Sequence, residues 1–146
     1  MTATFQFLAT FTAALFAGAA LYINVVEHPA RMLLDPKVAL LQWAPSYKRA
    51  TWLQAPLALV SFVCGVMVWL LGGSVQWLLG ALLVGSVVPF TFLVIMPTNR
   101  LLLADGPDTP SDTTRQRLQR WSQLHAVRSG LSLIGTLVYL RQLVWA

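Results

Sequence analysis

The sequence predicts an all-α integral membrane protein, a single antiparallel four-helix bundle of residues 1–146 with both termini on the same side. Hydrophobic residues make up 57% of the chain and charged residues 10%, against roughly 25% charged in an average soluble domain. Apolar runs recur at a length of about 20 residues, which is what crossing about 30 Å of hydrocarbon requires. The basic residues gather on one side of these runs. These features favour a chain dissolved in lipid, where isolated charges are strongly disfavoured.

Three of the four spans follow directly from the apolar runs. We expect them over residues 4–26, 52–71 and 75–96. Only Gly-Gly-Ser separates the second span from the third, so these two must form an antiparallel hairpin. Pro56 lies about one turn into its helix, where a proline is tolerated. Pro89 lies well inside the third helix and should kink it.

The fourth span, over residues 121–144, is less obvious because it contains an arginine. Twelve uncharged residues separate Arg128 from Arg141, which places the two side chains about 20 Å apart along a helix. If Arg141 reaches one interface, Arg128 lies below the other, where a charge needs a partner inside the protein. Either this helix does not span, or Arg128 is paired within the bundle. We favour spanning, because a C-terminal apolar helix has no other place to bury itself.

The charges also give the bundle an orientation. Nine of the ten Lys and Arg residues lie on the side of the connections 27–51 and 97–120, and only Arg141 lies opposite. The positive-inside rule therefore predicts that both connections are cytoplasmic and that both termini are not. The tryptophans fit two interfaces: Trp43, Trp52 and Trp121 on the loop side, and Trp69, Trp77 and Trp145 on the other.

The sequence predicts neither a nucleic-acid partner nor a site built from cysteines. The net charge of +5 is explained by basic residues flanking membrane spans, so we expect no nucleic acid. The single cysteine excludes an internal disulfide and a cysteine-rich metal site. The expected partners are the lipid bilayer and a hydrophobic small molecule, and the chain is compatible with an oligomer.

Polar residues that could carry chemistry gather at the loop-side ends of the spans. Most of them would be polar in any loop, but Asn24, Gln54, His125 and Arg128 fall inside the predicted spans. His125 and Arg128 also share a helical face with Trp121, because the three are spaced by four and three residues. The sequence therefore predicts a partly buried polar pocket that opens at the cytoplasmic face. Two further residues at these ends, Tyr47 and Asn99, are expected to line it.

Two hypotheses concern the charged groups of this pocket. Glu27 is the acid placed near the end of the first span, which makes it the expected counter-ion of Arg128 in a pair that fixes how these helices dock. Alternatively, Glu27, His28 and His125 could form a two-histidine, one-carboxylate iron site, or the histidines could ligate haem. We predict no metal or cofactor, because the adjacent Glu27 and His28 point about 100° apart on a helix.

Four segments resemble the anthrone oxygenase-like family of small four-helix membrane proteins, whose bacterial members mostly form a domain of unknown function. They are EHPAR (27–31), WAPSYKRA (43–50), PFTFLVIMPTNRLL (89–102) and WSQLHAVRSG (121–130), in order over nearly the whole chain. The resemblance implies a bacterial inner membrane. From the activity assigned to a few fungal members, it also implies oxidation of a polycyclic anthrone to an anthraquinone by molecular oxygen, without a bound cofactor.

Carried onto this chain, that activity gives the pocket residues roles. His125 would be the base, and Arg128 with Asn24 or Asn99 would stabilise the enolate or peroxide oxyanion. Glu27 completes the expected catalytic set. The expected substrate-binding residues are Trp121, Asn99, Gln54, Phe90, Trp52 and Tyr47.

Two competing interpretations stay open. One is a non-catalytic membrane protein that binds lipid or a hydrophobic ligand, or serves as an assembly subunit. The other is a proton-coupled carrier using Glu27 and His125, which would need an oligomer because four short helices form a small translocation path.

Overall fold

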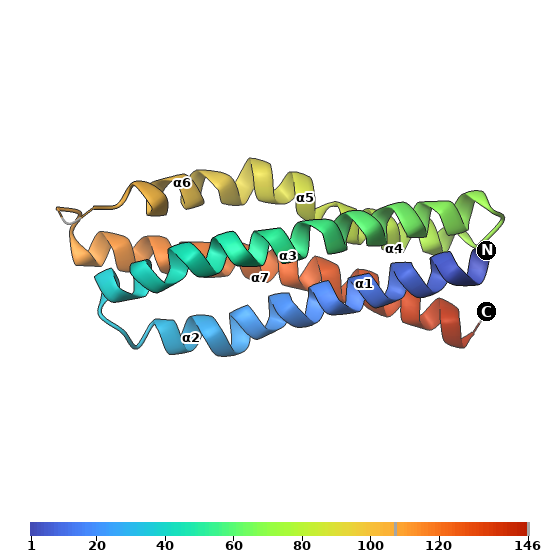
Figure 1. The fold of residues 1–146 in the computed structure, drawn as a ribbon, viewed down its shortest axis with the longest axis horizontal. Helices are drawn as coiled ribbons and strands as arrows, with labels where there is room; N and C mark the ends of the chain where they lie inside the picture. Colours follow the sequence, from blue (N-terminus) through green and yellow to red (C-terminus); the bar gives the residue numbers. More distant parts are fainter. Residues whose placement is uncertain (107, 146) are drawn as a thin grey trace.

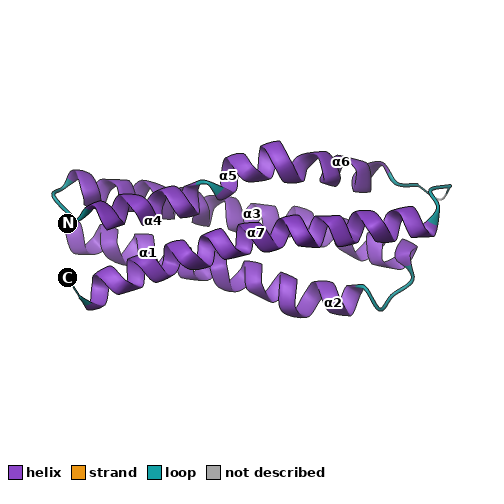
Figure 2. Cartoon of the chain, turned by 180° about the vertical axis from the view of Figure 1, so that it is seen from behind, coloured by secondary structure: helices purple, strands orange, loops and turns teal. Residues whose placement is uncertain are grey.

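The computed structural model describes residues 1–106 and 108–145, and every regular element in this part of the chain is helical. The helices form four antiparallel rods (Figures 1 and 2). Both termini and the turn between the second and third rods lie at one end, here called the turn end; the opposite end is the loop end. In chain order the rods are α1 (Thr2–Tyr22) with η1 (Ile23–Glu27) and α2 (His28–Arg31); α3 (Pro36–Leu70); α4 (Val75–Gly85), α5 (Val87–Phe90), η2 (Thr91–Ile95) and α6 (Met96–Ala104); and α7 (Ser111–Val144). The predicted four-helix bundle is confirmed.

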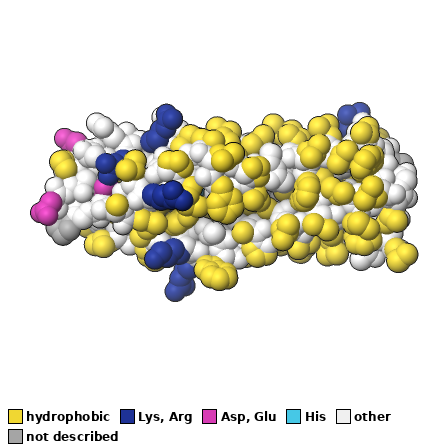
Figure 3. Space-filling model, turned by 90° about the horizontal axis from the view of Figure 1, so that it is seen from above, with side chains coloured by type: hydrophobic (Ala, Val, Ile, Leu, Met, Phe, Trp, Pro, Cys, Tyr) yellow, Lys and Arg dark blue, Asp and Glu magenta, His cyan; other side chains and the backbone are white. Residues whose placement is uncertain are grey.

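Three rods are long and apolar enough to cross a membrane: Thr2–Arg31, Pro36–Leu70 and Val75–Ala104. These segments make the chain a membrane protein. The fourth rod, α7, is 34 residues long and packs against both α1 and α4. It carries polar residues in both halves, among them Arg128 and Arg141, and is not one of these three apolar segments. That α7 spans the membrane stays a prediction. In Figure 3 hydrophobic side chains are spread over much of the visible face, and most of the Lys and Arg side chains in view gather toward the loop end, with one basic group at the turn end.

The connections at the loop end are much shorter than the expected segments 27–51 and 97–120. The first rod continues to Arg31, and α3 begins at Pro36. Asp35 caps α3, because its carboxylate accepts a 2.9 Å hydrogen bond from the backbone N–H of Lys37. Pro36 at the first helical position needs no hydrogen-bond partner for its nitrogen. Expecting a loop here was wrong, since an Asp-Pro pair is a helix start signal that the apolar runs do not include.

The third rod is broken near its middle, as the proline there predicts. α4 ends at Gly85, and α5 begins at Val87. Pro89 has no N–H to offer to the carbonyl of Gly85 one turn earlier, and its ring crowds that carbonyl. The rod therefore changes direction at Ser86, and the segment from α5 to α6 runs apart from α4 (Figure 1).

The core of the turn-end half is built from small residues around one buried aromatic pair. Trp77 and Tyr139 stack with ring centroids 5.1 Å apart, and Tyr139 donates a 3.3 Å hydrogen bond to the carbonyl of Ser61. Gly80 makes room for the tyrosine, since a Cβ built there would lie 2.6 Å from its ring. Trp77 is thus a core residue, although the sequence suggested that it marks a membrane interface.

Candidate active site

Two π-helical turns flank the loop-end half of the bundle. One is η1, which carries Asn24, and the other is η2, which carries Thr91. Each ends two positions before a proline, Pro29 or Pro97. A proline leaves the carbonyl four residues earlier without its donor and pushes it aside, so the helix widens by one residue. The widening turns polar side chains from both rods toward the interior, which no search for apolar runs would detect.

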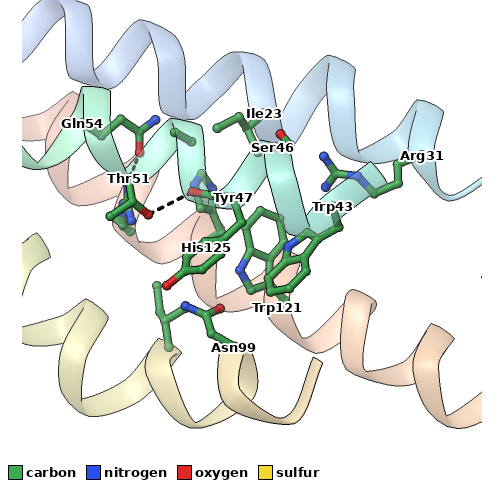
Figure 4. Close-up of a pocket in the computed structure, with 13 residues that line it drawn as sticks. Ile23, Arg31, Trp43, Ser46, Tyr47, Thr51, Gln54, Asn99, Trp121 and His125 are labelled. Atoms are coloured by element: carbon green, nitrogen blue, oxygen red, sulfur yellow. Dashed lines mark hydrogen bonds between the residues drawn. The ribbon is translucent and has the colours of Figure 1, made fainter. Parts of the chain in front are cut away.

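Between these turns lies a pocket with aromatic walls, shown in Figure 4. Trp121 stacks on His125 at 4.9 Å and meets Trp43 edge to face at 5.8 Å. Trp43 in turn stacks on Tyr47 at 5.1 Å, with the planes only 4° apart. Asn99 of α6 points toward these rings from the opposite side. The pocket comprises about 380 Å³, but its interior is narrow, with room for little more than a water-sized molecule.

His125 is held by an amide from the first rod. Its Nδ1 lies 2.7 Å from Oδ1 of Asn24, and the amide nitrogen of Asn24 donates to the backbone carbonyl of Ser122 at 3.1 Å. Because that carbonyl can only accept, the amide oxygen must face the imidazole, and Nδ1 must be its donor. Ser129 also donates to the same amide oxygen at 2.6 Å. In the neutral ring the lone pair is therefore on Nε2, for which no hydrogen-bond partner occurs among the described residues.

Arg128 lies beside His125 without a carboxylate. Its guanidinium donates to Oε1 of Gln54, and a second nitrogen lies 3.5 Å from the Thr91 hydroxyl. The ring of Phe16 lies 5.1 Å below the guanidinium carbon, a cation–π distance. Neutral dipoles and an aromatic face thus hold this cation, and the predicted ion pair with Glu27 is wrong.

Glu27 instead pairs with Arg31, one turn further along its own rod. The same carboxylate accepts from Ser46 of α3, and Arg31 also donates to Gln42. Arg31 is buried and lies 5.9 Å from the ring of Trp121. Positions four apart share a helical face, so the near arginine takes the carboxylate before the distant one can reach it.

Hydrogen-bonding groups without partners concentrate in this pocket. Five buried side-chain atoms of the described residues have no partner, and all of them belong to pocket-lining residues. Four of them are nitrogens that carry N–H donors, and the fifth is a carbonyl oxygen. The five atoms are Nε1 of Trp43, Nε2 of Gln54, Nδ2 and Oδ1 of Asn99, and Nε of Arg128. Each unpaired buried group costs about 1–3 kcal/mol, so such a cluster indicates a site built for a polar ligand.

Comparison with known proteins places the chain in a family. The family profile described as "Anthrone oxygenase" matches residues 43–138. An anthrone oxygenase of Pestalotiopsis fici is 32% identical over 122 residues, covering 73% of this chain and 85% of the relative. This chain belongs to the anthrone oxygenase family. No solved structure matches it.

Two further members of the anthrone oxygenase family are similar to the chain. One, from Cryptosporiopsis sp., is 29% identical over 139 residues, which cover 89% of this chain and 80% of the relative. The other, from Aspergillus fumigatus, is 40% identical over 76 residues, covering 50% of this chain and 47% of the relative. The profile match includes the pocket residues of α3, η2, α6 and α7 but not those of the first rod.

The anthrone oxygenase fold brings most of the predicted site residues together. Seven of them line the pocket or bind a residue that does: Asn24, Tyr47, Gln54, Asn99, Trp121, His125 and Arg128. Trp52 does not belong there, because it is 83% exposed on the outer face of α3. Phe90 packs against the aromatic cluster but is not among the residues that line the cavity. Glu27 does not line the cavity, but it forms an ion pair with Arg31, which does.

Three contributors were missed from the sequence: Arg31, Trp43 and Ser129. Arg31 and Trp43 fall in the segment taken for a loop, where a polar or aromatic residue carries little information. The spacing of four between Trp43 and Tyr47 would have placed both on one face of a helix had the Asp-Pro start signal been used. Ser129 was overlooked as a small residue, although it follows His125 by one turn.

The histidines do not converge with Glu27. His28 and His125 each pack against Trp121, at 5.5 and 4.9 Å between ring centroids. The Glu27 carboxylate is engaged by Arg31 and Ser46. Over residues 1–106 and 108–145 no three His, Cys, Asp or Glu side chains gather in a way that could hold a metal ion. The arrangement gives the iron hypothesis no geometric support.

Proposed function

We propose that the protein is a membrane-embedded oxygenase that converts an anthrone-type aromatic ketone to a quinone with molecular oxygen, using only its own side chains. One observation supports this most: every buried side-chain nitrogen or oxygen without a hydrogen-bond partner in the described chain belongs to a residue that lines the pocket containing His125. Four N–H donors around a free imidazole nitrogen suit a reaction in which a base removes a proton and negative charge develops on oxygen.

In the proposed first step, Nε2 of His125 takes a proton from the ring CH₂ group of the anthrone. The electron pair moves onto the ketone oxygen and gives an anthrolate. Donors from Arg128 and Asn99 stabilise this oxyanion in surroundings that exclude water, where such donors are most effective. Asn24 holds the imidazole in the tautomer that keeps Nε2 free, as the carboxylate does in a serine protease triad.

Oxygen then reacts with the anthrolate. The electron pair returns to the ring carbon, a C–O bond forms there, and the proton held by His125 passes to the outer peroxide oxygen. Removal of the second hydrogen of that carbon as a proton, with cleavage of the O–O bond, gives the second ketone and water. The balance is one anthrone and one O₂ to one anthraquinone and one H₂O. The narrow polar pocket has the width that O₂ or water needs.

The test is turnover by the protein purified in detergent, with anthrone as substrate. We expect one O₂ consumed per quinone formed, above the uncatalysed rate and without released peroxide. His125→Ala should lower kcat by roughly 100-fold or more. Gln123→Ala is the matched control, because Gln123 is exposed on the same helix. Equal turnover by the parent and His125→Ala would overturn the mechanism. Tight binding of anthraquinone without any turnover would favour a non-catalytic binder instead.

For the membrane we propose a bacterial inner membrane, with the loop end of the bundle facing the cytoplasm. The support is the gathering of Lys and Arg at that end, where the positive-inside rule expects them. An alkaline phosphatase fused to the C-terminus should then be active in a bacterial host, and a fluorescent protein fused there should be dark. The opposite pair of results would reverse the orientation.

A further inference from the structure

The polar pocket continues into a second, larger cavity on the lipid-facing side. The space between its walls, including the part open to the surroundings, is about 540 Å³, and it lies between α3 and the segment α5–η2–α6. Tyr47, Thr51, Gln54 and Arg128 line both spaces. The polar pocket is too narrow for a ring system, so a flat substrate has to occupy the adjoining cavity if its oxygen is to reach the donors.

A third cavity prolongs this space toward the middle of the bundle. It is an open groove of about 480 Å³, counting the space open to the surroundings; it lies beside the break at Ser86 and shares Ala58 and Val88 with the second cavity. The two cavities together form one apolar trench, defined by Ala55, Ala58, Leu59, Val88, Phe92 and Met96. The trench exists because the Pro89 break directs α5 and η2 away from α4, so their side chains do not close over α3.

The inner end of the trench is polar, and the two polar atoms there that have no hydrogen-bond partner are both donors. Gln54 is only 1% exposed, and its amide nitrogen has no partner. The Nε of Arg128 is also buried without a partner. Both residues line the trench as well as the polar pocket. A ligand that satisfies them must present an acceptor oxygen at one end and apolar surface elsewhere.

The trench lies at membrane depth. Ala55 precedes Leu71 at the turn end by sixteen residues, about 24 Å along a helix, and Phe62 precedes it by nine, about 14 Å. Both distances fall within a hydrocarbon layer of about 30 Å. The trench therefore opens toward lipid, and its length along α3, from Ala55 to Phe62, is about 10 Å.

We infer that this trench binds the apolar body of a membrane-dissolved aromatic ketone or phenol, which enters sideways from the bilayer. Its oxygen-bearing ring lies at the mouth that the trench shares with the polar pocket, where Gln54 and Arg128 contact the oxygen. From the pocket side, Asn99 faces the oxygen and His125 faces the ring CH₂. An apolar substituent extends along α3 toward Leu59. The inference rests on the proposed function for the identity of the oxygen-bearing ring, and it names the substrate class: lipophilic aromatic ketones carrying an apolar chain.

Benzophenone tests the location directly, because it is a diaryl ketone that attaches to nearby C–H bonds under ultraviolet light. We expect adducts on the peptides containing residues 54–62 and 87–96 of the protein in lipid nanodiscs, suppressed by excess anthraquinone. Adducts spread evenly over the lipid-facing residues of α7 and unaffected by anthraquinone would overturn the inference. Protected adducts near Lys37 and Leu40 would also overturn it, since they would indicate entry from the loop end.

A blocking variant tests the chain preference. Ala55 is exposed and lines the trench, so Ala55→Phe fills the trench without entering the core. We expect the Kd of 4-hexylbenzophenone to rise roughly tenfold. Ala14→Phe is the matched control, because Ala14 is exposed on α1 away from the trench. Equal effects of the two variants would overturn the inference.

These measurements do not depend on turnover. His125→Ala should label like the parent, since His125 does not line the trench. Turnover of anthrone without protected labelling in the trench would overturn the inference and leave the proposed function standing. Protected labelling without turnover would overturn the proposed function and leave the inference about the trench standing.

Discussion

Asn24 of the first rod and His125 of the fourth are joined by a 2.7 Å hydrogen bond, although 101 positions separate them in the chain. The amide is itself fixed by its bond to the carbonyl of Ser122. The imidazole orientation is therefore set from outside its own helix. This contact links the packing of α1 against α7 to the chemistry that we propose for Nε2.

Asn24→Leu should impair turnover without unfolding the bundle. The variant removes the acceptor that keeps the proton on Nδ1, so His125 spends part of its time in the unproductive tautomer. We expect kcat to fall by roughly tenfold or more, with anthraquinone binding unchanged. Asn24→Asp retains an acceptor at the same place and should recover most of the rate. Equal kcat values in the Leu variant and the parent would contradict the positioning role.

Arg128→Leu should lose activity but not stability. The guanidinium has no carboxylate partner, only Gln54, Thr91 and the face of Phe16. Burying a charge without a counter-ion is costly, so replacing it with an apolar side chain removes that desolvation cost. We therefore expect an unchanged or higher Tm in detergent, together with a large drop in kcat/KM. A Tm lowered by many degrees would show that Arg128 stabilises the fold and would contradict this prediction.

Glu27→Leu should be more damaging to stability than Arg128→Leu. It leaves the buried guanidinium of Arg31 without its carboxylate, which costs about 3 kcal/mol for a buried pair. The double variant Glu27→Leu/Arg31→Leu should regain part of that loss, because no unpaired charge remains. Unfolding by denaturing detergent measures both. Additive losses in the double variant would show that the two side chains are not coupled.

Gly80→Ala should destabilise the turn-end core. The added methyl group would lie 2.6 Å from the ring of Tyr139, and such overpacking costs about 1–3 kcal/mol. Gly18→Ala is the matched control, because nothing lies within 4 Å of a Cβ built there. It should not destabilise the protein, since alanine is more favourable than glycine inside a helix by about 1 kcal/mol. Tyr139→Leu combined with Gly80→Ala should relieve the clash. Gly80 would not be a packing position if both glycine variants unfolded alike.

The features that can be predicted from the sequence depend on residues that are neighbours in the chain. Those that cannot depend on contacts between distant segments. The break near Pro89 followed from the sequence, because a proline acts on the carbonyl four residues before it whatever surrounds the helix. The start of α3 at Pro36 could also have been predicted, since Asp-Pro is a local signal. The Glu27–Arg128 pair was predicted wrongly, because the choice between two arginines depends on how far the first rod continues as a helix.

The sequence by itself determined that the chain forms apolar helices of membrane length with its basic residues at one end. Hydrophobicity and charge act on each segment separately, so they can be summed along the chain. Only the tertiary structure decided which polar groups meet: Asn24 with His125, Gln54 with Arg128, and Glu27 with Arg31. These pairings depend on the rotation of each rod about its axis. One π-turn or one broken helix changes that rotation and leaves the hydrophobic pattern almost unaltered.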